Sequence, residues 1–146
     1  MMLSNKCKYA LKALVILAAE GTRLSSSLIA AKARVPEKFL EAILRDLRHA
    51  GTLVSTRGAQ GGHALSAAPE TIRLGAVVRA IDGMLAPLPC ASTFYYSKCA
   101  DCVEEDICVI RHAMLEVRNK ISEVLDSMSL ADLVNMSPRK RQKIFW

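Results

Sequence analysis

The chain has 146 residues, 51% of them hydrophobic and 23% charged, which suits one globular domain with an appendage and excludes both a disordered chain and a large multidomain enzyme. Its net charge of +6 favours a polyanionic partner. The whole excess lies in residues 1–68, which carry 10 basic and 4 acidic side chains, whereas residues 69–146 carry 10 of each. The N-terminal half is therefore expected to meet the polyanion.

The first predicted element is an amphipathic helix over residues 5–20. Ser4 is its expected N-cap, and Gly21 follows its last turn. Residues 9–19 resemble a short signal peptide, but Lys12 interrupts them and their apolar side chains recur on one helical face. No stretch approaches 18 uncharged apolar residues, so we expect no membrane span and a cytoplasmic protein, in which cysteines are reduced or metal-bound.

Two further helices follow, a short one ending near Ala33 and a second one over residues 36–50, separated by a break at residues 35–36. Two short helices with a tight break between them predict a helix-turn-helix motif. The apolar side chains predict which face of the second helix is buried: Phe39, Leu40, Ile43, Leu44 and Leu47.

Residues 53–56 and 63–65 read as two strands, joined by the segment RGAQGG at residues 57–62. The glycines permit positive φ angles and close backbone approach. A helix-turn-helix followed by such a hairpin predicts a winged helix. The expected fold class is thus mainly α with a small β-hairpin wing, followed by a long C-terminal dimerisation helix.

Basic charge, helix-turn-helix and wing together predict binding of double-stranded DNA. Lys38 and Arg45 suit phosphate or base contacts, Glu41 suits a cytosine amino group, and Arg57 suits a narrow minor groove. No catalytic motif is found, so no enzyme is expected. The candidate DNA contacts are Lys38, Glu41, Ala42, Arg45, Arg57, Gly58, Gln60, Gly61 and Gly62.

The C-terminal half begins with a predicted linker helix that opens at residues 70–71 and closes at residues 82–83. After a cysteine-rich loop (88–108), apolar residues spaced by alternating steps of three and four predict a dimerisation helix over 107–129. The expected organisation is a DNA-binding domain over 1–68, whose first helix also packs on the dimer region, then a linker, loop and dimerisation region over 69–136, and a basic tail over 137–146.

Four cysteines in the loop have the spacing C-x8-C-x2-C-x5-C: Cys90, Cys99, Cys102 and Cys108. Four thiolates within a flexible loop can reach one iron-sulfur cluster, and the same set suits zinc. A thiol switch between Cys99 and Cys102 is the third alternative. His112 is a further candidate ligand, and Cys7 reads as a small buried hydrophobe.

The chain resembles the Rrf2 family of bacterial winged-helix transcription regulators, in its cluster-bearing branch. The resemblance rests on LSNK at residues 3–6 with Tyr9 and Ala10, on residues 39–51, on the wing RGAQGGHAL at 57–65, and on LADLV at 130–134. It spans residues 1 to 134 almost without gaps.

The resemblance implies a homodimer whose long helices cross, placing two winged helices on a palindromic operator. It also implies a [2Fe-2S] or [4Fe-4S] cluster that reports iron, redox or nitric oxide status, with Cys90 and Cys108 as outer ligands and Cys99 or Cys102 between them. The family also contains cluster-free members, which implies control by thiol oxidation, zinc or a partner protein as the alternative. Ala42 replaces a base-selecting glutamine of one family member, so a different operator sequence is expected.

Overall fold

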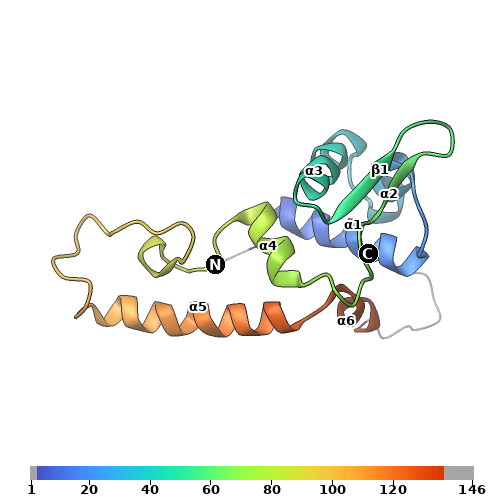
Figure 1. The fold of residues 1–146 in the computed structure, drawn as a ribbon. Coiled ribbons are helices and arrows are strands. Elements are labelled where there is room, and N and C mark those ends of the chain that lie inside the picture. The colour runs from blue at the N-terminus through green and yellow to red at the C-terminus, as the bar shows by residue number, and fades with distance from the viewer. Residues whose placement is uncertain (1–2, 137–146) are drawn as a thin grey trace.

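The computed structural model describes residues 3–136 and is mostly helical, with one two-stranded antiparallel sheet, which confirms the predicted fold class (Figure 1). No helix among these residues has the length and apolarity that crossing a membrane requires. In chain order the elements are α1 (Asn5–Glu20), α2 (Ser26–Ala33), α3 (Glu37–His49), β1 (Leu53–Thr56), β2 (Gly62–Leu65), α4 (Leu74–Asp82), the 3-10 turn η1 (Pro89–Ala91), α5 (Val109–Ser127) and α6 (Leu130–Asn135).

The core lies where α1, α2 and α3 meet, with α4 and α6 packed against α1. The Ser4 side chain accepts a hydrogen bond from the backbone N–H of Cys7, and Gly21 ends α1 with a φ of 63°, so both predicted caps are confirmed. On α3 the predicted buried residues Leu40, Ile43, Leu44 and Leu47 are fully buried. These contacts fix α3 relative to the rest of the N-terminal half.

Phe39 is the exception, because the prediction that it lies on the buried face of α3 is wrong. Its side chain is 43% exposed. It lies at the edge of the apolar stripe, where its ring makes an edge-to-face contact with Tyr9 of α1, with ring centroids 5.8 Å apart. The ring thus covers the outside of the α1–α3 contact.

The wing, residues 53–65, is an antiparallel hairpin in which Ser55 lies opposite His63. Its second strand is attached to the chain before α2, because Leu24 and His63 exchange two backbone hydrogen bonds of 3.0 and 2.8 Å. Gly62 has a φ of 133°, and a Cβ there would lie 2.5 Å from the Leu24 carbonyl oxygen. The close approach predicted for these glycines is therefore an approach to the protein's own backbone.

The linker helix α4 begins at Leu74, later than the predicted start at residues 70–71. Arg73 has extended backbone angles and forms a β-bridge with Ser129. Hydrogen bonds from Leu74 N–H to the Met128 carbonyl and from Leu130 N–H to the Ile72 carbonyl hold this crossing. Backbone pairing with a distant segment therefore makes α4 begin later in the chain than the local sequence predicts.

The helix α5 begins at Val109 and runs beneath α4, and the cysteine loop lies beyond α4 along the first half of α5 (Figure 1). No residue of α5 is buried. A bidentate ion pair between Arg79 of α4 and Asp126 of α5, with two N–O distances of 2.7 Å, joins the two helices. The predicted basic tail at 137–146 lies outside the described residues.

Candidate DNA-binding face and cysteine loop

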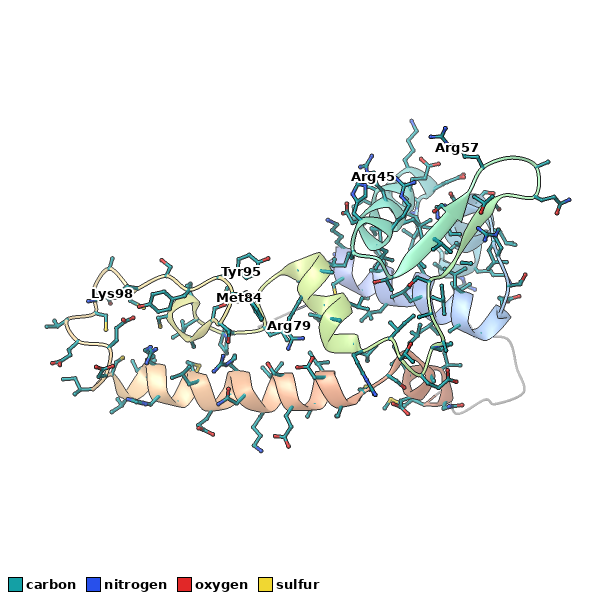
Figure 2. The ribbon with its side chains drawn as sticks, viewed as in Figure 1. Arg45, Arg57, Arg79, Met84, Tyr95 and Lys98 are labelled. Carbon is teal, nitrogen blue, oxygen red and sulfur yellow. The ribbon has the colours of Figure 1, made fainter. Side chains whose placement is uncertain are left out.

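The candidate DNA contacts on α3 form one polar stripe. Lys38, Glu41 and Arg45 are exposed, and Ala42 is half-buried between them. Figure 2 shows Arg45 of α3 and Arg57 of the wing on the same side of the molecule, opposite α5. The two elements therefore present their polar side chains to one common surface.

The residue Arg57 is exposed directly after β1, where the chain enters the wing tip. Gly58 and Gln60 are exposed at the tip, whereas Gly61 and Gly62 are half-buried. A Cβ on Gly61 would overlap the Thr56 carbonyl oxygen, so this glycine makes the tight turn of the hairpin possible. The arginine is thus carried on a narrow, backbone-stabilised projection.

Three side chains at this face were not singled out from the sequence. Arg48 lies three residues after Arg45 and extends the same stripe, which the helical spacing could have indicated. Arg23 donates to the Gly62 carbonyl oxygen at 3.0 Å. His63 lies on β2 opposite Ser55, and burial together with the nearby Arg48 and Arg23 lowers its pKa.

The four loop cysteines form two pairs. The Cys99 thiol donates to Cys90 Sγ at 3.6 Å, and the Cys102 thiol lies beside that of Cys108. Among residues 3–136 no three His, Cys, Asp or Glu side chains converge in a group that could hold a metal ion. The neighbour of Cys99 is Cys90, whereas the thiol-switch hypothesis from the sequence joined Cys99 to Cys102.

One thiol of each pair, Cys99 or Cys102, has a raised pKa. A hydrogen bond to Cys90 and burial raise the pKa of Cys99, with added repulsion from Asp101. Burial and the neighbouring Cys108 raise the pKa of Cys102. A nearby positive charge would therefore favour the thiolate forms of Cys99 and Cys102.

The donor set fits an iron-sulfur cluster or zinc in its chemistry, because both groups bind soft thiolates and supply positive charge. Between η1 and α5 the chain forms no helix or strand, so regular structure does not fix the distance between the two pairs. Cys108 caps α5 by accepting from the Arg111 N–H at 3.5 Å. Arg111 in turn donates through Nε to the Cys90 carbonyl oxygen at 3.1 Å. The outer cysteines are thereby tied to the first turn of α5.

The two remaining candidate ligands have other partners. His112 Nε2 lies 2.7 Å from the Asp106 carbonyl oxygen, so this nitrogen donates to the backbone. Cys7 is fully buried against Val78 and Leu85. Burial and the nearby Asp82 raise the pKa of Cys7 to about 12. Cys7 therefore remains a protonated thiol, in line with its interpretation as a small buried hydrophobe.

A helix-turn-helix, a wing and basic side chains on one surface define a winged-helix DNA-binding protein. A family model for the Rrf2 "iron-dependent transcriptional regulator" matches residues 3–136. The chain belongs to this family, whose members are transcription regulators and not enzymes. The resemblance stated from the sequence is thereby confirmed.

Individual relatives are similar to this chain over nearly its whole length. An rrf2-like HTH-type transcriptional regulator of Rhodobacter capsulatus is 44% identical over 138 residues, covering 91% of this chain and 92% of that protein. The structure of CymR, the global cysteine regulator of Bacillus subtilis, is 29% identical with a TM-score of 0.76, covering 94% and 98% of the two chains. IscR of T. potens is 28% identical with a TM-score of 0.74, covering 97% and 92%.

Proposed function

We propose that the protein is a homodimeric, sequence-specific DNA-binding regulator that reads a palindromic operator. The common surface of α3 and the wing, with Arg45 and Arg57 on one side of the molecule, is the observation that carries this proposal. The N-terminal part of α3 contacts base edges in the major groove, and Arg57 enters the adjacent minor groove. Two such units in one dimer match two half-sites.

The dimer proposal is supported by α5. This helix has an apolar seam without a covering element among residues 3–136, and large apolar side chains along and before it are exposed. A second copy of α5 would remove this seam from water. These exposed side chains are Ile107, Val109, Ile110, Val117 and Val124.

We further propose that four cysteines hold an iron-sulfur cluster, [2Fe-2S] or [4Fe-4S]: Cys90, Cys99, Cys102 and Cys108. When bound, this cluster would respond to iron, to redox state or to nitric oxide. Cys108 caps α5 and Arg111 bonds to the Cys90 carbonyl oxygen. A change in how the loop holds its four sulfurs therefore changes the contacts of the dimerisation helix. This coupling would alter the spacing of the two DNA-reading units.

The first experiment is an anaerobic absorbance spectrum of freshly purified protein, with iron, sulfide and zinc analysis. A brown protein with stoichiometric iron and sulfide is expected. Cys108→Ala should lose the visible absorbance, while the matched variant Cys7→Ala should keep it, because Cys7 is fully buried against Val78 and Leu85. A cluster spectrum retained by Cys108→Ala would exclude Cys108 as a ligand.

The DNA proposal is tested separately by titrating a duplex that the protein itself selects from a random library. Arg57→Ala should weaken binding, whereas Lys120→Ala, which removes one positive charge from the exposed polar side of α5, should not. Unchanged affinity of Arg57→Ala at moderate salt would refute the role of the wing. Equal binding of selected and scrambled duplexes would refute sequence specificity.

A second candidate is a cluster-free regulator controlled by thiol oxidation, by zinc or by a partner protein, and the 3.6 Å contact between Cys90 and Cys99 favours its oxidation form. Hydrogen peroxide would take two electrons and two protons from these thiols, forming one disulfide and two waters. This candidate predicts colourless, iron-free protein that releases DNA on oxidation and rebinds after thiol reduction. Stoichiometric zinc in colourless protein would favour the zinc form.

A further inference from the structure

A cleft opens between α2, α3 and the two strands of the wing, on the surface shared by Arg45 and Arg57. Its volume is about 220 Å³, several times the roughly 30 Å³ that one water molecule occupies. The cleft therefore has room for a hydrated anionic group. Its polar lining consists of Ser26, Glu41, Arg45, Arg48, Ser55 and His63.

The imidazole of His63 is held between two hydroxyl groups. Its Nδ1 lies 2.8 Å from Ser55 Oγ on β1, and its Nε2 lies 3.1 Å from Ser26 Oγ at the start of α2. Its backbone is fixed to Leu24 by two hydrogen bonds. His63, which lines the cleft, therefore links α2 to both strands of the wing.

The charges around His63 are mainly positive. Arg45 and Arg48 line the cleft from α3, and Arg23 lies close by, bonded to the Gly62 carbonyl oxygen. Glu41 is the one carboxylate in the lining. The surplus of guanidinium groups attracts an anion, and arginine matches the geometry of phosphate oxygens.

We propose that this cleft binds one phosphate of the DNA backbone, held by Arg48 and the two serine hydroxyls, and that protonation of His63 strengthens this contact. The proposal rests on the proposed DNA binding and names a contact within it. Arg48 and His63 are positioning residues here, since a phosphate contact sets the register of α3 on the duplex without reading the sequence.

The hydrogen bonds of His63 explain the effect of the proton. A neutral imidazole has one donor and one acceptor nitrogen, so one serine hydroxyl must direct its hydrogen at the ring. An imidazolium donates through both nitrogens, and both hydroxyl hydrogens are then free to point at a phosphate oxygen. Protonation adds a positive charge and one hydroxyl donor without breaking either contact.

The direction of the pH dependence follows from the charges. In the free protein, burial and the repulsion from Arg48 and Arg23 lower the pKa of His63 and outweigh the opposing effect of Glu41. A bound phosphate neutralises this repulsion and favours the imidazolium. DNA binding therefore takes up a proton, and affinity rises as the pH falls through the range in which histidine titrates. A rise of one unit in the pKa of His63 on binding corresponds to about tenfold tighter binding per protomer.

The phosphate contact is tested with duplex DNA selected from a random library by the wild-type protein. Arg48→Ala should reduce the magnitude of the slope of log affinity against log salt by about one per protomer. It should also weaken binding to the selected and to the scrambled duplex by the same factor. A single neutral methylphosphonate at the contacted position should weaken DNA binding by the wild type more than DNA binding by Arg48→Ala, which keeps only the serine and His63 contacts. An unchanged salt slope in Arg48→Ala would overturn the phosphate site.

The proton coupling is tested between about pH 5 and pH 8, where glutamate remains ionised and histidine titrates. Wild-type affinity should increase toward the acidic end, and His63→Gln should remove this increase. His49→Gln, which changes an exposed histidine of α3, should retain it. Identical pH profiles of His63→Gln and the wild type would overturn the coupling.

A measurement on the unmodified protein covers the case in which His63→Gln does not fold. Calorimetric titration of the wild type with the same duplex, in buffers of different ionisation enthalpy, should report uptake of protons on binding near neutral pH. Zero uptake would overturn the coupling. Failure of the wild type to bind any duplex would instead refute the proposed function itself, so the two failures are distinguishable.

Discussion

Gly75→Ala is expected to disturb the junction between α4 and α5. A Cβ on Gly75 would overlap Oδ1 of Asp126 and lie 2.9 Å from Nη1 of Arg79, the two residues of the bidentate ion pair. Alanine in place of glycine normally stabilises a helix by roughly 0.5–1 kcal/mol. An ion pair at the surface contributes about 0.2–1 kcal/mol, and Asp126 is 46% exposed, so the lost pair offsets the helical gain.

The double-mutant cycle with Asp126→Ala separates the two effects. In the wild-type background, Gly75→Ala should either not change the free energy of unfolding or decrease it. In the Asp126→Ala background, the same substitution should increase the free energy of unfolding by roughly 0.5–1 kcal/mol. Urea and thermal denaturation at one fixed protein concentration provide the measurement, because a dimer's stability depends on concentration. Equal stabilisation of both backgrounds would refute the steric argument.

Three further predictions concern single residues. Cys7, with a pKa of about 12, should resist iodoacetamide at mildly alkaline pH until the protein is denatured, and mass spectrometry showing its modification in native protein would contradict its burial. Ser129→Ala should lower the free energy of unfolding by about 1 kcal/mol, because the buried Ser129 side chain caps α6; an unchanged urea midpoint would speak against the cap. Arg79 holds the pKa of Asp126 below its ordinary value of 3.8, so the pair stabilises the fold above that value and the contribution disappears as the pH falls through the lowered pKa. Arg79→Ala should therefore reduce the melting temperature at neutral pH but not in strong acid, and an equal reduction at both pH values would contradict this sign.

Most helices and both strands could be predicted because their signals are local. The caps Ser4 and Gly21 and the apolar periodicity of α3 each depend on residues within a few positions of one another. The prediction for Phe39 was wrong because it lies at the edge of the apolar stripe, where periodicity does not reveal whether another element covers the ring. Tyr9 reaches it only from one side.

The positions of the candidate DNA contacts on α3 and in the wing could be predicted for the same reason, because a helical stripe and an arginine beside a glycine-rich turn both depend on neighbouring residues. Their role in DNA binding stays a prediction. The cysteine spacing predicts soft ligands, but it does not decide which sulfurs meet. Cys90 and Cys99 are nine residues apart, and only the path of the loop between η1 and α5 brings them within 3.6 Å.

The sequence by itself thus determined that this is a winged-helix protein with a basic N-terminal half, a thiol-rich loop and a long helix with an apolar stripe. Only the tertiary structure decided that His63 lies between hydroxyls from two other elements, one of them 37 residues away in the chain, and that Gly75 makes room for Asp126 of α5. The physical reason is that caps and periodicity act within one or two helical turns. Contacts between distant residues depend on how whole elements pack.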